Sequence, residues 1–219
     1  MEATERGDKP KTLQSIAYIN IPNSADLDFL LWDLQDAIAA YAQLSGTAFP
    51  RPVDLGKDDN DGAEGIVLAV EDVPNDKTMA AIEQALDRFG DAGARVYVVV
   101  KTDIGDLERA HGLVERLRAV CDLRDLSWCG GVTVCTGAGA AALRRSPRMG
   151  LLRRPFSEAI DKLVGAVRMG CSVEHAQQLG GGNAGSVDAD GMVRAKPALP
   201  APIWHAIIKH LGSRAQSNI

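Results

Sequence analysis

Several short segments of the chain are apolar along their whole length, and this feature limits the folds that the sequence can adopt. The run GIVLAV (65–70) contains no polar side chain, and ARVYVVVK (94–101) has only valine and tyrosine between its two cations. A strand with one solvent-exposed face alternates polar and apolar side chains, whereas a strand buried on both faces is continuously apolar. These segments therefore predict buried strands.

Segments with helical spacing separate the predicted strands. After a strand candidate at 13–21, apolar residues recur every three or four positions, at Leu27, Leu30, Leu31, Leu34, Ile38 and Tyr41. Asn23 or Ser24 can cap this helix, which is expected to end before Gly46. Further helices are expected over 79–89, 107–121 and 155–170, with a short strand near 49–55 and another strand beginning near Trp128. This alternation is typical of a parallel sheet with helices on both faces.

The chain length of 219 residues is sufficient for one large α/β domain and short for two. We expect a disordered leader over 1–12 and one domain over 13–172. Residues 173–219 are expected to form a C-terminal extension, with a flexible glycine-rich loop at 179–191 and a short helix at 202–212. The apolar side of that helix predicts packing on its own domain or on a partner.

Composition excludes several classes of function. A net charge of −5 disfavours nucleic-acid binding, which depends on a basic surface. The four cysteines lack C-x-x-C spacing and the four histidines lack metal-ligand spacing, so buried reduced thiols and no metal site are expected. We find no apolar signal segment and no run long enough to span a bilayer, and expect a soluble, cytoplasmic protein without membrane contact.

A glycine-rich turn follows the strand that begins near Trp128. Gly137, Gly139 and Ala142 match the spacing of the dinucleotide-binding pattern G-x-G-x-x-A. That pattern normally joins the first strand to a helix and is followed by an acidic residue at the end of the next strand. Here the strand is predicted to be the last one, and the acids Glu158 and Asp161 fall within a predicted helix. A tight glycine turn is therefore favoured over a dinucleotide site.

The same region resembles a known family. Several segments are similar to parts of the flavodoxin-like NAD(P)H-dependent FMN oxidoreductases. They are Cys121, the run from Leu126 through Trp128, Gly131 and Val134 to Gly137, the turn Pro147-x-x-Gly150, the pair Arg153-Arg154 and the tail PALPAPIWHAIIKHLGSRA. The chain would be a divergent member, because Asp125, Thr133 and Cys135 stand where this family commonly has glycine. The order of elements agrees over 13–212, and the motifs are concentrated in 121–170 and 197–214.

This resemblance implies a flavodoxin-like three-layer sandwich with five parallel strands in the order 2-1-3-4-5. It also implies a flavin reductase that binds FMN and accepts hydride from NAD(P)H. A homodimer is the alternative in which the last helix packs on a neighbouring subunit. Ligands of such a fold bind at the carboxyl ends of the strands. The residues implied to hold the cofactor lie in three loops: Asn20, Pro22, Asn23 and Ser24; Glu71, Asp72, Val73 and Pro74; and Thr102 and Asp103. No catalytic residue is identified.

The first of these loops departs from the family. NIPNSAD (20–26) has no glycine or arginine, so only Asn23 and Ser24 offer side-chain donors to a phosphate. Carboxylates are instead expected around the rim of the sheet, at Asp26, Asp28, Glu71, Asp72, Asp76, Asp103 and Asp106, with Lys77 and Lys101 as partial counter-charges. These acids are helix caps and turn residues, or they bind a hard cation such as Mg²⁺. An alternative to the flavin enzyme is a flavin-less scaffold, or a binding or assembly module.

Five arginines lie between positions 144 and 154, at Arg144, Arg145, Arg148, Arg153 and Arg154. They are interpreted as a solvated loop, or as groups that meet an NADPH phosphate, a nucleic acid or a partner subunit, and the overall acidity of the chain disfavours the nucleic acid.

Overall fold

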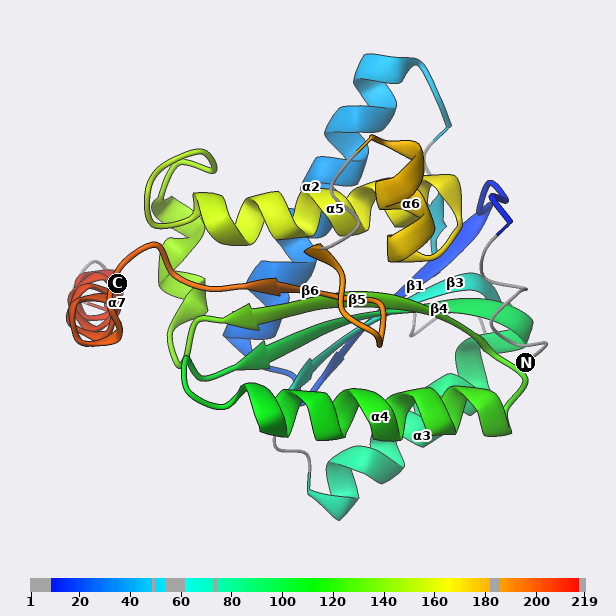
Figure 1. The fold of residues 1–219 in the computed structure, drawn as a ribbon, viewed down its shortest axis with the longest axis horizontal. Helices are drawn as coiled ribbons and strands as arrows, with labels where there is room; N and C mark the ends of the chain where they lie inside the picture. The colour runs from blue at the N-terminus through cyan, green and yellow to red at the C-terminus, as the bar shows by residue number, and fades with distance from the viewer. Residues whose placement is uncertain (1–8, 49, 54–61, 73–74, 182–185, 217–219) are drawn as a thin grey trace.

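A computed structural model of the chain describes residues 9–48, 50–53, 62–72, 75–181 and 186–216 (Figure 1). It contains one parallel sheet in the order β2-β1-β3-β4-β5-β6. The strands are β1 (Ser15–Ile21), β2 (Arg51–Pro52), β3 (Ala63–Glu71), β4 (Gly90–Thr102), β5 (Ser127–Cys135) and β6 (Met192–Ala195). The predicted α/β, flavodoxin-like class is confirmed, with six strands in place of the predicted five.

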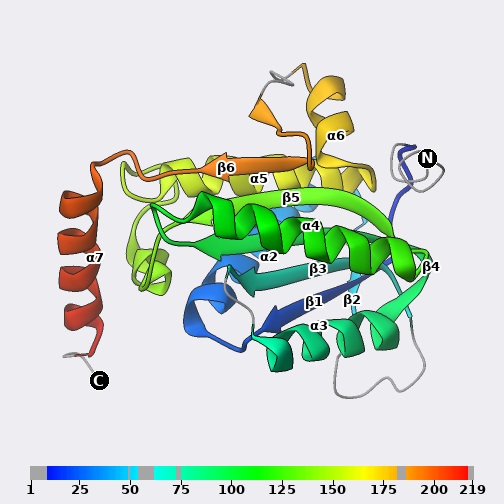
Figure 2. The same cartoon turned by 60° about the horizontal axis from the view of Figure 1, so that its bottom comes forward.

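Two layers of helices cover the sheet (Figures 1 and 2). The helices α2 (Ala25–Ser45) and α5 (Arg154–Met169) cover one face, and α3 (Asp76–Phe89) and α4 (Leu107–Leu123) cover the other. Along β4, Tyr97 and Val99 belong to the core under α2 and α5, whereas Val98 and Val100 belong to the core under α3 and α4. Because both faces of the strand are buried, its sequence is continuously apolar.

The helix ends follow the signals in the sequence. Ser24 caps α2 by accepting the N–H of Leu27, and the helix ends at Gly46, which has a φ of 63°. Pro155 lies in the first turn of α5, and Gly170 follows this helix with a φ of 54°. A Cβ at position 170 would lie 1.7 Å from the carbonyl oxygen of Lys11, so the close approach of the N-terminal segment also requires glycine there.

The described part of the predicted leader is bonded to the domain. The N–H of Lys11 donates to the carbonyl of Met169 over 2.9 Å, and the Arg95 guanidinium donates to the carbonyl of Lys9 over 2.9 Å. Residues 1–8 lie outside the described residues.

The sheet continues beyond residue 172, the expected end of the domain. A helix that the sequence did not predict, α6 (Val173–Leu179), leads toward β6, which pairs in parallel with β5 at Thr133↔Arg194. The expectation that β5 is the last strand is therefore wrong. β6 has only four residues and includes exposed Arg194 at the sheet edge, so it gives little apolar signal. Within the expected flexible loop, Asp188 accepts the N–H groups of Asp190 and Met192, and 182–185 are not described.

The last helix, α7 (Ala201–Gln216), stands at the carboxyl end of the strands (Figure 2). Trp204 and Ile208 are buried, and α7 packs mainly against the short 3-10 helix η1 (Ala140–Arg145). Of the two predicted alternatives, packing on its own domain is therefore present. No helix among the described residues combines the length and the apolar character needed to cross a bilayer.

All four cysteines are buried thiols outside any disulfide, as the sequence predicted. Burial raises the pKa of the Cys121 and Cys129 thiols to about 12, so both are protonated near neutral pH.

Candidate functional site

The loops that the sequence singled out meet at one edge of the sheet. β1, β3 and β4 are adjacent and parallel, so the segments that follow Ile21, Glu71 and Thr102 lie side by side at their carboxyl ends. The β1 strand also has β2 on its other side, which makes this edge the point where the strand order reverses. In open parallel sheets, ligands bind at such a point.

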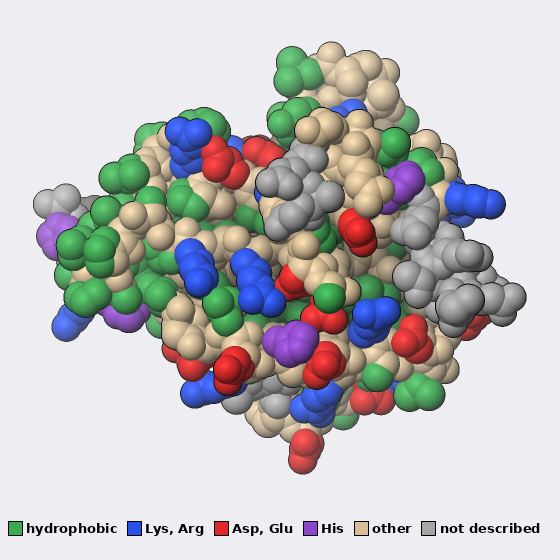
Figure 3. All heavy atoms as spheres, viewed as in Figure 1, with side chains coloured by type: hydrophobic (Ala, Val, Ile, Leu, Met, Phe, Trp, Pro, Cys, Tyr) green, Lys and Arg blue, Asp and Glu red, His purple; other side chains and the backbone are tan. Residues whose placement is uncertain are grey.

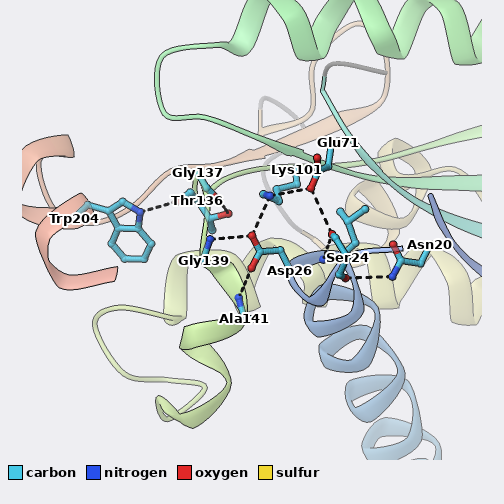
Figure 4. A network of polar contacts seen from close by, with 11 residues as sticks. Asn20, Ser24, Asp26, Glu71, Lys101, Thr136, Gly137, Gly139, Ala141 and Trp204 are labelled. Atoms are coloured by element: carbon cyan, nitrogen blue, oxygen red, sulfur yellow. Dashed lines mark hydrogen bonds and ion pairs between the residues drawn. The ribbon is translucent and has the colours of Figure 1, made fainter. Parts of the chain in front are cut away.

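The centre of this edge is the carboxylate of Asp26, in the first turn of α2 (Figure 4). One oxygen accepts the backbone N–H of Gly139 over 2.9 Å, and the other accepts that of Ala141 over 2.8 Å. The ammonium of Lys101, at the end of β4, lies 3.0 Å from the carboxylate. Asp26 thus joins α2, η1 and β4 through charge-assisted hydrogen bonds, which are stronger than neutral ones.

The surroundings fix the charge of this pair. Burial raises the pKa of Asp26, but the hydrogen bonds from Ala141, Gly139 and Lys101 outweigh it, and the pKa lies below its usual value of 3.8. Burial likewise lowers the pKa of Lys101, but Asp26 and Glu71 outweigh it, and the pKa lies above its usual value of 10.5. Both groups are therefore ionised at neutral pH.

The polar side chains of the first predicted loop bond to other groups of the chain. Lys101 also lies 3.1 Å from Glu71, which accepts a hydrogen bond from the Ser24 hydroxyl over 3.4 Å. The Asn20 amide donates to the carbonyl of Ser24 over 3.3 Å and contacts Asp28 and the Asn23 side chain. Of the two side chains expected to donate to a phosphate, Ser24 thus donates within the chain, whereas Asn23 accepts through its Oδ1.

The other predicted site residues are not shown to join this network. The hydroxyl of Thr102 donates to Asp72 over 2.7 Å, while Asp103 is exposed. Pro22 follows a cis peptide bond, and Val73 and Pro74 lie outside the described residues. Within the part of the chain that the structure describes, no group of three or more His, Cys, Asp or Glu residues is arranged to hold a metal ion. The magnesium hypothesis has no ligand set there.

The glycine turn after β5 serves the packing of α7. Gly137 and Gly139 have φ values of 65° and 94°, and a Cβ at position 139 would lie 2.7 Å from a methyl group of Ile208. The indole N–H of Trp204 donates to the carbonyl of Thr136 over 2.9 Å (Figure 4). The turn leads into η1, only six residues long, whose first N–H groups are bonded to Asp26. These contacts favour the glycine-turn interpretation over a dinucleotide site.

The arginine cluster contains both exposed and buried side chains: Arg144, Arg145 and Arg154 are exposed, Arg148 is half-buried and Arg153 is buried. Arg153 is 5% exposed, pairs with the buried carboxylate of Asp33 and lies over the ring of Phe29. Arg148 pairs with Asp161 over 2.6 Å, and Arg154 pairs with Glu158 over the same distance. The solvated-loop interpretation is therefore wrong for Arg153, because burial and an internal counter-charge hold it in place.

The sequence did not identify the centre of the site. Asp26 was expected as a helix-end carboxylate or as one ligand of a hard cation, with Lys101 as a partial counter-charge, and the N–H groups of Gly139 and Ala141 were not anticipated. The Asp26 contacts span 113 and 115 residues and end on backbone groups, which leave no residue-type pattern. The signals available in the sequence were Asp26, at the start of α2, and Lys101, near the end of β4.

The fold and the site define a flavodoxin-like α/β protein in which side chains bridge the carboxyl edge of the sheet. No model of a known protein family matches the chain, and no curated protein matches its sequence.

The Asp26 network makes a testable contribution to stability. We expect Asp26→Asn to lower the free energy of unfolding at pH 7 by about 2–3 kcal/mol, because charge-assisted bonds are lost and Lys101 loses a counter-charge. A carboxyl whose folded pKa is depressed stabilises fully above its usual pKa, 3.8, and this stabilisation is lost as the pH falls through the depressed value. Urea unfolding at several pH values should therefore show the difference between wild type and variant shrinking below about pH 4.

The matched control is Asp76→Asn, since Asp76 also lies in the first turn of a helix. It should cost only about 0.3–1 kcal/mol, the usual size of a helix-dipole contact. If both variants lose the same free energy of unfolding, the hydrogen bonds and ion pair of Asp26 add nothing to the helix-dipole contact.

Proposed function

We propose that this protein is a flavin-free member of the flavodoxin type that works as a binding or assembly module. The observation that carries the proposal is the Asp26 carboxylate, which accepts two backbone N–H groups and pairs with Lys101 at the ligand-binding edge. In this arrangement the Asp26 carboxylate accepts backbone N–H groups, which are the kind of donor that binds the anionic group of a ligand in other proteins.

The residues at this edge do not fit FMN. A phosphate needs a cradle of free N–H and hydroxyl donors, usually at a helix N-terminus. Here Ser24 accepts the N–H of Leu27 and donates to Glu71, and Asn20 donates to neighbours in the same loop. The carboxylates of Asp26 and Asp28, both in the first turn of α2, would repel a phosphate placed there. A reductase role with NAD(P)H is for this reason the weaker hypothesis.

The proposal also includes the compartment and the assembly state. Four buried thiols that form no disulfide support a reducing compartment such as the cytoplasm. A homodimer is compatible with an assembly role, and sedimentation of the purified protein tests it directly.

Flavin binding decides between the module and the enzyme. We expect FMN fluorescence to remain unquenched with protein added to about 100 μM, which corresponds to a binding free energy weaker than about −5.5 kcal/mol. Saturable one-to-one quenching, with a protein-bound absorption band near ~450 nm, would contradict the proposal. Ser24→Ala then gives the location, because it should weaken any FMN held through the predicted loop and leave binding elsewhere unchanged.

A further inference from the structure

One end of the molecule exposes large apolar side chains. The loop between η1 and α5 and the outer side of α7 both lie at this end (Figures 1 and 2). Met149 and Leu151 in the loop are 63% and 64% exposed, and Ile203 on α7 is 51% exposed. Hydrophobic side chains gather over α7 in Figure 3. Exposed apolar groups that cluster in this way mark interaction surfaces more often than scattered ones do.

The two segments that form this surface differ in charge from the whole chain. Neither 126–157 nor 191–219 contains an aspartate or a glutamate, so all 29 acidic residues lie in other segments. Arg144 and Arg145 are exposed, as is Lys209 on α7, and none of the three pairs with a carboxylate among the described residues. In a protein of net charge −5, these two segments therefore carry cations and apolar groups without acidic residues of their own, although exposed Asp103 lies beside the turn at Gly137.

Buried contacts hold the loop in place. Arg153 pairs with Asp33 beneath it, and Arg148 pairs with Asp161 on α5. The carbonyl of Pro147 accepts the N–H of Gly150 over 2.9 Å, which closes a tight turn before Leu151. Met149 and Leu151 are thus presented on a fixed backbone, and a partner that binds them need not order the loop first.

We propose that this surface, defined by Arg144, Arg145, Met149, Leu151, Ile203 and Lys209, binds an acidic amphipathic segment of another protein. Apolar residues of such a segment would cover Met149, Leu151 and Ile203, and its carboxylates would meet the three cations. The inference rests on the proposed role as a binding module and names the chemistry of its partner.

Other occupants fit less well. A second copy that presented the same surface would place like charges opposite one another, which disfavours a symmetric pairing. The net charge of −5 repels nucleic acids and anionic membranes, and exposed methionine and leucine add nothing to phosphate binding. A partner that carries both carboxylates and apolar side chains is complementary to the three cations and to the exposed apolar side chains of this surface.

The test uses the full-length protein and a fluorescein-labelled helical peptide of leucine and glutamate. We expect a dissociation constant in the micromolar range (about 10–100 μM) at low salt, weakening as salt is added. The matched peptide of leucine and lysine should bind at least about tenfold more weakly. The variant Arg144→Glu/Arg145→Glu should weaken the acidic peptide by roughly tenfold, and Met149→Ser/Leu151→Ser should do the same.

The control variant is Lys77→Glu/Arg116→Glu, which makes the same charge change on the α3 and α4 side and should bind as wild type does. Circular dichroism establishes that each variant is folded before it is scored. The proposal is overturned if both peptides bind equally, if the control weakens binding as much as the arginine variant, or if no binding occurs. Self-association lost in Arg144→Glu/Arg145→Glu, or binding to phosphatidylserine vesicles in preference to the peptide, would also overturn it. FMN binding is measured separately, so failure of the proposed function is distinguishable from failure of this surface.

Discussion

Replacing Asp33 with asparagine is expected to destabilise the protein by about 3–5 kcal/mol, because it leaves a buried guanidinium without its counter-charge. Asp33 is 1% exposed and pairs with Arg153, which is 5% exposed. Its carboxylate also accepts the hydroxyl of Ser157 over 3.2 Å and lies 3.5 Å from Arg148. Equilibrium unfolding in urea at pH 7, with the midpoint and the slope both fitted, measures the loss.

Two further variants show whether the loss comes from the buried pair. Asp36→Asn alters an exposed acid on the same helix and should change stability by less than about 0.5 kcal/mol. The double variant Asp33→Leu/Arg153→Met removes both charges, and we expect it to be more stable than Asp33→Asn, since apolar replacement of a whole buried pair costs little. A double variant that loses as much as the sum of its single variants would argue against an uncompensated charge as the cause.

The fold could be predicted from the sequence because its central strands are buried on both faces. Val98 and Val99 pack into opposite cores, so the run 94–101 carries a strong apolar signal. The sequence did not predict β6 and α6, because these short elements carry only a weak apolar signal. β6 pairs over four residues, and α6 is only seven residues long, so neither supplies a full repeat of apolar spacing.

The candidate site could be placed on the right edge but not assembled from the sequence. Parallel topology brings the loops after β1, β3 and β4 together, and this much follows from the strand order alone. The bonds that matter join Asp26 to Gly139 and Ala141, and the pair beneath the arginine loop joins Asp33 to Arg153, 120 residues apart. Such pairings depend on how the layers stack, and no local spacing encodes them.

The second large effect concerns the docking of α7. Trp204 is fully buried, lies 5.5 Å from the ring of Phe156 and donates its indole N–H to the carbonyl of Thr136. We expect Trp204→Ala to remove about 3–5 kcal/mol from the docking of this helix, through lost burial and the cavity left behind. Trp204→Phe keeps most of the apolar contact and loses the hydrogen bond, which should cost only about 1 kcal/mol beyond the change in ring size.

The loss should be local, because α7 is held mainly by η1 and by the buried side chains Trp204 and Ile208. Amide hydrogen exchange should therefore accelerate along α7 in Trp204→Ala, while amides of β3 and β4 keep their protection. In Trp204→Phe, the exchange rate along α7 should lie between the rates of Trp204→Ala and the wild type. Equal loss of protection in β4 would mean that α7 is part of the global folding unit, and unchanged protection in α7 would mean that Trp204 does not hold it. Selective acceleration instead identifies α7 as a helix that can leave the carboxyl edge of the sheet while the sheet stays folded.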